Sequence, residues 1–293
     1  MTDIHIALTF NDAFWAPAYA VMRSVCLASP RRADMVFHLC HDGLSAEHAS
    51  VLDTIADEFG ARLAYHPLRE DERFRSMARD LPVGRRFPSV VYARLLLDLI
   101  VPPEAERVIY LDCDTMLLDD IAALHEVDLG GKALGAVRDG WALFNKNGRD
   151  AREKRDIFDP ASPYFNSGML VIDLARFAAA DIPGRLAELR AAGVLEKLYY
   201  DQDMLNLIFA GDWVELDWRW NVIDPRMAHQ ALHPKLLHFT GEQRPWSLFA
   251  GIFQTVAFGR LYRHVMTNDV FYRFWRERQI RRLKKLWPFR GRQ

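Results

Sequence analysis

Short apolar runs alternate with amphipathic stretches through the first part of the chain, and this pattern predicts a parallel α/β sheet. Three runs have the length and composition of buried strands: residues 4–10, 35–40 and 62–66. Between them, residues 15–27 have helical spacing, and Ser45 is placed to cap a helix that ends just before Gly60. In doubly wound folds of this order, ligands bind beyond the carboxyl ends of the strands, where Asn11 and Asp12 stand.

The segment 106–121 is the most informative part of the chain. Its residues 108–111 are branched, aromatic or leucine, as in a strand buried on both faces, and Asp112 and Asp114 follow directly. Residues i and i+2 of an extended chain point the same way, so both carboxylates can enter one pocket. Close carboxylates repel unless a cation lies between them, and a hard divalent ion fits that position. A plain strand-end turn is the alternative for so short a motif.

Residues 89–100 are expected to form a helix that ends before two prolines, after a polar surface loop or short helix at 69–88. Arg94 falls close to the apolar stripe of this helix, which consists of Tyr92, Leu95, Leu96 and Leu99. Two interpretations of Arg94 remain open. It is either a solvated or capping side chain, or an inward guanidinium aimed at an anion, a role that its planar fork suits.

Polar groups also flank strands further along. A short strand is followed by Asp139, and Asn166 and Ser167 come directly before an apolar strand. Gly168 would let a ligand approach the backbone there, although a plain turn explains the same residues.

Helices are expected at 146–156 and 178–198, and Asp201 and Gln202 open another one together with Asp203. Acids at a helix start complement the helix dipole, so these residues either cap the helix or present polar groups to a sugar.

His238 lies in a strand-like run that precedes Gly241 and Arg244. It is either a satisfied core histidine or, if it meets the acids at 112 and 114, a third metal ligand. Arg244 would then be placed to meet a phosphate.

Half of the 293 residues are hydrophobic, which allows a sizeable core and argues against disorder. The three cysteines are scattered, as expected for buried thiols in a reducing cytoplasm. We expect no transmembrane helix, and the N-terminus is expected to form a strand instead of a signal peptide. No Gly-rich phosphate-binding signature is present, which counts against dinucleotide oxidoreductases and P-loop NTPases.

The formal net charge of −1 conceals a basic C-terminus. From Phe271 onward, nine Lys and Arg residues accompany the single acid Glu277, which gives this segment +8 and leaves −9 for the rest. Large apolar side chains are interleaved with the bases: Phe271, Phe274, Trp275, Ile280, Leu283 and Trp287. Such a segment suits anionic membranes, at about 1 kcal/mol per basic residue. A helix that packs on the domain and a nucleic-acid-binding segment are the alternatives.

Four motifs in order carry a family resemblance: YLDCD at 110–114, FNSGMLVID at 165–173, YDQDMLN at 200–206 and HFTGEQRPW at 238–246. They resemble the retaining glycosyltransferases of family 8, whose bacterial members include lipopolysaccharide galactosyl- and glucosyltransferases. The resemblance covers about residues 4–246 and implies a GT-A type nucleotide-sugar-binding α/β fold with a mainly parallel central sheet, which we expect at 1–250. The basic segment is expected to form a helical tail at 251–293. It also implies an enzyme that depends on Mn²⁺, with Mg²⁺ as an alternative, and uses a UDP-sugar.

Transferred residue by residue, the resemblance makes Asp112, Asp114 and His238 the metal ligands. Donor contacts are expected from Thr9, Asn11, Asp12, Arg86, Arg94, Asp112, Cys113, Asp139, Asn166, Ser167, Gly241 and Arg244. The family more often has Asp where this chain has Asn11, and commonly Lys where it has Arg244. Both differences alter the expected contact.

Asp201 and Gln202 stand where the resemblance places catalytic side chains. A double displacement would need one of them as a nucleophile beneath the sugar ring. Front-face attack, in which the leaving phosphate takes the acceptor's proton, is the preferred route because the amide of Gln202 is a poor nucleophile.

The expected function is transfer of galactose or glucose from a UDP-hexose to a saccharide or glycolipid acceptor of lipopolysaccharide or another cell-surface glycan. The expected location is the cytoplasm, peripheral on the cytoplasmic face of the inner membrane, with no nucleic-acid partner. A nucleotide-sugar- or nucleic-acid-binding protein without turnover is the alternative, and the complete set of metal ligands favours the enzyme. A nucleotidylyltransferase is disfavoured because no Gly-rich, basic loop follows the first strand.

Overall fold

The computed structural model describes residues 2–83, 88–140, 157–158, 162–198, 200–248, 250 and 256–286. A seven-stranded sheet forms its centre, in the order β3-β2-β1-β4-β7-β6-β8. The strands are β1 (Ile4–Asn11), β2 (Met35–Asp42), β3 (Arg62–Pro67), β4 (Arg107–Leu111), β6 (Leu134–Arg138), β7 (Phe165–Asp173) and β8 (Trp213–Glu215). Neighbours pair in parallel except at β7, which is antiparallel to β4 and β6, so the expected mainly parallel sheet is confirmed.

The reversed direction of β7 matters for the site. Because β7 starts where β1 and β4 end, its first residues share an edge with the carboxyl ends of those strands. The backbone N–H of Asp112 donates to the carbonyl oxygen of Gly168 at 2.8 Å. Asn166 and Ser167 therefore belong to the strand itself.

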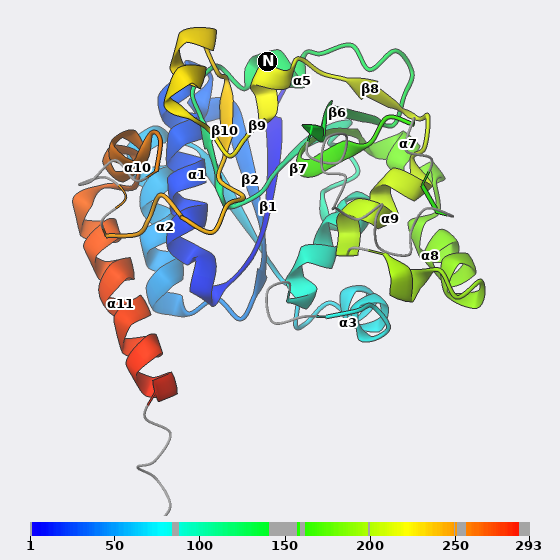
Figure 1. The fold of residues 1–293 in the computed structure, drawn as a ribbon, viewed down its shortest axis with the longest axis horizontal. Coiled ribbons are helices and arrows are strands. Elements are labelled where there is room, and N and C mark those ends of the chain that lie inside the picture. Colours follow the sequence, from blue (N-terminus) through cyan, green and yellow to red (C-terminus); the bar gives the residue numbers. More distant parts are fainter. Residues whose placement is uncertain are drawn as a thin grey trace, which may run out of the picture.

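Helices cover both faces of the sheet (Figure 1). One face carries α1 (Trp15–Ala28), α2 (Ala46–Phe59), α10 (Gly259–Met266) and α11 (Asn268–Leu286). The other carries α3 (Glu72–Arg79), α4 (Leu97–Ile100), α7 (Leu174–Ala179), α8 (Ile182–Ala191) and α9 (Tyr200–Ile208). Alternate residues of β4 enter the two cores, Ile109 on the α1 side and Tyr110 on the α9 side, as the period of a strand requires.

The first two helices form as expected. The Ser45 hydroxyl accepts the N–H of His48 at the start of α2, and Gly60 ends this helix with φ +73°. A cap and a left-handed glycine are local signals, which is why the sequence predicted both ends.

The helix expected at 89–100 forms with these bounds, but most of it is not an α-helix. Residues 89–100 begin as a 3₁₀ helix, η3 (Ser89–Leu96), and only the last turn is α-helical. A 3₁₀ helix aligns positions three apart, so Arg94 faces inward with Val91, whereas Leu99 is exposed instead of completing an apolar stripe.

The helix expected at 178–198 is broken. The chain ends α7 at Ala179, and Asp181 adopts φ 45° and caps α8 by accepting the N–H of Gly184. Pro183 explains the break, because proline fits the first turn of a helix but not its interior. The helix expected at 146–156 lies outside the described residues.

A second, three-stranded sheet sits beside the carboxyl end of β4. It has the order β5-β10-β9, with β5 (Thr115–Leu117), β10 (Leu236–His238) and β9 (Val222–Ile223). His238 pairs with Thr115, and the N–H of Phe239 donates to the Asp114 carbonyl at 2.8 Å. This pairing brings His238 next to the central acidic motif. A short helix, α5 (Ala122–His125), follows β5.

The C-terminal helices pack on α1. Phe271 and Phe274 of α11 are buried in the same core as Trp15 and Tyr262, whereas Ile280 and Leu283 are exposed. Within the residues that the structure covers, no helix is long and apolar enough to cross a bilayer.

Candidate active site

A cavity of about 570 Å³ opens where the carboxyl ends of β1 and β4, the start of β7 and the start of α9 converge. Thirteen of the expected site residues line it: Thr9, Asn11, Arg94, Asp112, Cys113, Asp114, Asp139, Asn166, Ser167, Asp201, Gln202, His238 and Arg244. Segments separated by more than a hundred residues thus meet at one edge of the sheet, as doubly wound folds predict.

Asp112, Asp114 and His238 form a compact group on the cavity wall. One ligand atom from each lies within 4.8 Å of the others, and His238 Nε2 is 3.1 Å from Asp114 Oδ1 and 3.7 Å from Asp112 Oδ2. Two carboxylate oxygens and one imidazole nitrogen are ligands that a hard or borderline divalent ion accepts. The donor set therefore fits a bound divalent cation.

A chain of amides orients His238 for this role. Its Nδ1 donates to Asn221 Oδ1 at 2.9 Å, and Asn221 in turn donates to Asn166 Oδ1 at 2.9 Å. With the proton on Nδ1, the lone pair of Nε2 points toward the two carboxylates, as a metal ligand requires. Asn221 lacks a recognisable sequence signal, and its importance emerges only from this contact.

Gly168 leaves the space that His238 occupies. A Cβ at this position would lie 2.1 Å from His238 Cε1 and 2.9 Å from Asp112 Oδ2. No side chain fits at those distances, so the glycine is required by the imidazole as much as by a ligand.

Charges around the group set its protonation. Burial alone would raise the pKa of Asp114, but His238 and Arg244 outweigh burial and lower it to about 2. Burial alone would lower the pKa of His238, and Asp114 and Asp112 instead raise it. Arg244 donates to Asp114 Oδ2 at 2.6 Å, so a guanidinium already stands beside the acidic pair.

Of the two interpretations of Arg94, the structure supports the inward guanidinium. It is buried and donates to Asp112 at 2.7 Å, to Asp201 at 3.0 Å and to the Ser167 carbonyl at 2.9 Å. Its guanidinium lies 4.3 Å from the centre of the Tyr110 ring. Burial alone would lower the pKa of Arg94, but the two carboxylates raise it. Arg94 therefore holds two acids of the site in place.

Gln202 is held at both ends of its amide. Its Oε1 accepts from Asn166 Nδ2 and from the Ser167 N–H, each at 3.2 Å, and its Nε2 donates to Asp139 at 3.0 Å. Asp201 lies beside it and accepts from the Ser167 hydroxyl at 3.3 Å. Burial raises the pKa of Asp201 despite the nearby Arg94.

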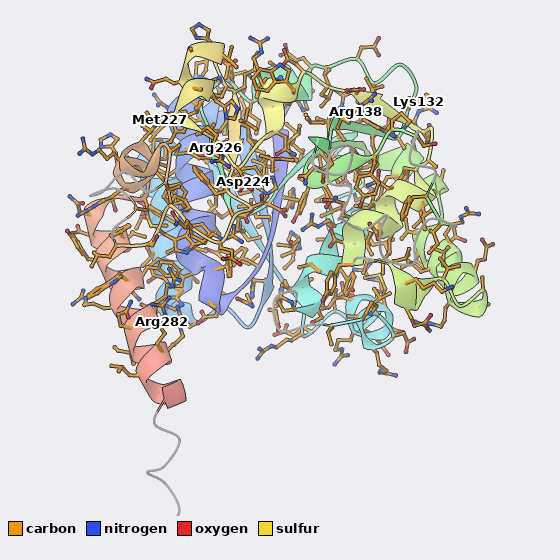
Figure 2. All side chains as sticks on the ribbon, viewed as in Figure 1. Lys132, Arg138, Asp224, Arg226, Met227 and Arg282 are labelled. Atoms are coloured by element: carbon orange, nitrogen blue, oxygen red, sulfur yellow. The ribbon has the colours of Figure 1, made fainter. Side chains whose placement is uncertain are left out.

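Two expected residues, Asp12 and Gly241, do not line the cavity. Asp12 points away from the cavity and pairs with His48 Nδ1 at 2.6 Å. The N–H of Gly241 donates to Asp224 at 2.6 Å, and it is Asp224 that lines the cavity. Asp224 lies near the middle of the molecule in the view of Figure 2. Arg86 lies outside the described residues.

Several other residues of the site went unrecognised in the sequence. The cavity also includes Phe10, Phe14, Pro88, Val90, Val91, Tyr200, Ile223, Asp224 and Thr240. The hydroxyl of Tyr110 lies 2.7 Å from Asp112 and 2.9 Å from Thr9, so this side chain supports two residues of the cavity wall. Its position two residues before Asp112 in a strand was the one available signal, since i and i+2 share a face.

Comparison with known proteins decides the family. The family model described as "Glycosyl transferase family 8" matches residues 5–249. The chain belongs to this family. Probable galacturonosyltransferase-like 10 of Arabidopsis thaliana is 27% identical over 264 residues, which cover 83% of this chain and 71% of that protein. General stress protein A of Bacillus subtilis (strain 168) is 23% identical over 262 residues, covering 83% and 87% respectively.

Solved structures place this family 8 glycosyltransferase among GT-A folds. The galactosyltransferase LgtC, in complex with donor and acceptor sugar analogues, matches with a TM-score of 0.74 at 23% identity over 90% of this chain and 95% of LgtC. The apo structure of the bifunctional WbbM matches with a TM-score of 0.73 at 17% identity, over 94% of this chain and 51% of WbbM. The GT-A fold expected from the sequence is confirmed.

Proposed function

We propose that this glycosyltransferase is metal-dependent and retaining, and that it moves galactose or glucose from a UDP-sugar to a saccharide acceptor of lipopolysaccharide or another cell-surface glycan. The observation that carries the proposal is the group formed by Asp112, Asp114 and His238 on the wall of the cavity. The catalytic domain in this proposal is 1–250, and 251–293 is its helical C-terminal segment.

Asp112, Asp114 and His238 would hold Mn²⁺, or Mg²⁺ in its place. When bound, such an ion supplies a Lewis acid that neutralises charge on a leaving diphosphate. Arg244 supports the same task, since its guanidinium already lies 2.6 Å from Asp114. Asn11 lines the cavity at the end of β1, where the nucleoside of the donor would bind.

The contacts of Gln202 and Asp201 favour front-face transfer. Both acceptor directions of Gln202 Oε1 are engaged by Asn166 and Ser167, which suits a group that positions the sugar better than one that attacks it. Asp201 shares its charge with Arg94, so it is a weak nucleophile. In the proposed route the acceptor hydroxyl attacks the anomeric carbon, the bond to the diphosphate breaks, and the proton passes to the departing phosphate oxygen.

The basic tail is proposed to bind an anionic membrane surface, on the cytoplasmic face of the inner membrane. Ile280 and Leu283 of α11 are 52% and 64% exposed, beside the bases Arg282 and Lys284. Arg282 lies on the lower part of α11 in Figure 2. Exposed apolar and basic side chains on one helix favour a headgroup region over water.

Release of UDP in the absence of acceptor tests the proposal. A panel of UDP-sugars, which includes UDP-galacturonate because of the name of the plant relative, is incubated with Mn²⁺ or EDTA and with wild type or Asp114→Ala. Metal-dependent release from UDP-galactose or UDP-glucose, lost in the variant, is expected. Release from no donor would contradict turnover, and UDP binding without release would favour the alternative of a binding protein.

A further inference from the structure

The C-terminal helix α11 is tied to the cavity wall by a continuous set of polar contacts. Glu277 is the single acid from Phe271 onward, and it lies where α11 passes the start of α1. Its Oε2 accepts the indole N–H of Trp15 at 3.0 Å, and its Oε1 lies 3.1 Å from Arg273 Nε and 3.3 Å from His48 Nε2. A carboxylate with three side-chain partners is held in place, so Glu277 attaches α11 to α1 and α2.

His48 continues these contacts toward the site. Its Nδ1 lies 2.6 Å from Asp12 Oδ1, so the ring spans two carboxylates, one on α11 and one just after β1. The ring is stacked on Trp15, with centroids 4.6 Å apart and planes 13° from parallel. Each ring nitrogen thus lies close to a carboxylate oxygen, and the ring links α11 to the residue that follows β1.

Asp12 stands inside the wall of the cavity without facing it. It begins the short helix η1 (Asp12–Phe14), and the residues on either side of this carboxylate, Asn11 and Phe14, both line the cavity. Asn11 Oδ1 caps η1 by accepting the N–H of Ala13 at 3.0 Å. Asp12 also accepts the N–H of Ser45 at 2.9 Å, which fixes it from the start of α2. Displacing Asp12 would therefore displace the wall.

We propose that Glu277 and His48 are positioning residues, through which the docking of α11 fixes the Asn11–Phe14 wall and thereby sets the affinity for the nucleotide part of the donor. This inference rests on the proposed function. It gives the C-terminal helix a role in donor binding through His48, which contacts both Glu277 and Asp12. Figure 1 shows α11 running beside α1 and α2 toward the same end of the molecule as the carboxyl end of β1.

Glu58 offers a matched control. It also lies on α2, ten positions after His48 and thus about 15 Å further along a helix. Its carboxylate pairs with Arg23 at 2.7 Å, and Arg23 donates to the Val265 carbonyl of α10 at 3.1 Å. Glu58→Gln thus weakens an attachment of the C-terminal helices that does not lead to the cavity.

The experiment is calorimetric titration of UDP in the presence of Mn²⁺, on full-length wild type, Glu277→Gln, His48→Gln, the double variant and Glu58→Gln. We expect Glu277→Gln and His48→Gln each to raise the Kd for UDP about fivefold, the effect of one lost hydrogen bond. The double variant should add little to His48→Gln, because the contacts act in series. Glu58→Gln should stay within about twofold of wild type while losing a similar amount of thermal stability.

Kinetics give a second readout. For a positioning role in donor binding, the donor KM of Glu277→Gln rises and its kcat stays close to that of wild type. Equal Kd values for UDP in Glu277→Gln, Glu58→Gln and wild type would overturn this inference alone. Failure of wild type itself to bind UDP would overturn the proposed function and this inference together.

Discussion

Gly168 is a position of the site at which no side chain fits. Its missing side chain makes room for His238 beside Asp112. Gly168→Ala should displace the imidazole and weaken Mn²⁺-dependent UDP binding by roughly 100-fold, measured by calorimetry.

Gly135→Ala is the control for that prediction. A Cβ there would lie 2.9 Å from Leu129 Cδ2 in the apolar core of β6, away from the cavity. We expect it to reduce the free energy of unfolding by about 1–3 kcal/mol and to leave UDP affinity unchanged. Equal losses of affinity in both variants would show that Gly168 has no special relation to His238.

Substitution of Arg94 tests whether its guanidinium holds Asp112 and Asp201 in place. Arg94→Gln leaves Asp112 and Asp201 close together without a shared cation, so the free energy of unfolding should fall by roughly 3–5 kcal/mol in denaturant titration. Arg138→Gln breaks the exposed pair with Glu215 and should cost less than about 1 kcal/mol. Similar costs for the two variants would contradict the structural role assigned to Arg94.

The sequence alone left the role of Arg94 undecided for a physical reason. The direction of its side chain depends on η3 being a 3₁₀ helix, and the apolar stripe suggested an α-helix. The role of Asn221 could not be predicted because this residue contacts His238 and belongs to no recognisable motif. Asp112 and Asp114 were accessible because a strand fixes the direction of residues two apart.

At the scale of elements, three neighbouring strands carry a row of histidines that the proposed reaction does not use. His38 Nε2 lies 2.9 Å from His5 Nδ1, and His38 Nδ1 lies 3.1 Å from His66 Nε2, across β1, β2 and β3. Burial, with the neighbouring histidines, lowers the pKa of His38 to about 3. Burial also lowers the pKa of His5 and of His66.

This row makes the fold sensitive to acid. The folded-state pKa of His38 lies below its unfolded value near 6.5, so the unfolded chain binds more protons as the pH falls. The contribution of His38 to the free energy of unfolding is therefore fully present above about pH 6.5 and is lost as the pH falls toward 3. The loss is about 2 kcal/mol at pH 5.

Denaturant titrations at pH 7.5 and pH 5 test this explanation. The free energy of unfolding should fall less between these two pH values for His38→Gln than for wild type. His264→Gln changes an exposed histidine of α10 and should behave as wild type does. The same pH dependence in all three proteins would refute this explanation.

Element boundaries were predictable where local chemistry sets them and unpredictable where pairing does. Ser45 and Gly60 fixed α2 from the sequence. The antiparallel direction of β7 and the pairing of β10 with β5 join segments that are distant in the chain, and no local pattern encodes them. His238 could be assigned to the site from the sequence only through a family resemblance.

At the scale of the whole molecule, the first part of α11 belongs to the hydrophobic core. Because Phe271 and Phe274 are buried, deletion from Phe271 would expose the core, and substitutions further along α11 test the membrane proposal more cleanly. Arg276, Arg282 and Lys284 are exposed bases of α11. Replacing these three by Gln should weaken binding to anionic vesicles roughly 100-fold in sedimentation assays.

The control removes an equal charge from another surface, by replacing the exposed Arg75, Arg79 and Arg185 with Gln. This variant should bind vesicles nearly as wild type does. Unchanged binding after the α11 substitutions would assign the tail to packing alone, and equal losses in both variants would indicate a general charge effect.

The central claim is that Asp112, Asp114 and His238 hold a divalent ion that binds the donor's diphosphate. It is tested most directly by calorimetric titration of UDP into wild type and His238→Gln, each with Mn²⁺ and with EDTA. The account predicts binding to wild type that weakens by roughly 100-fold in EDTA, and a variant that binds weakly under both conditions. UDP affinity that is the same with Mn²⁺ and EDTA, or unaffected by the loss of His238, would contradict it.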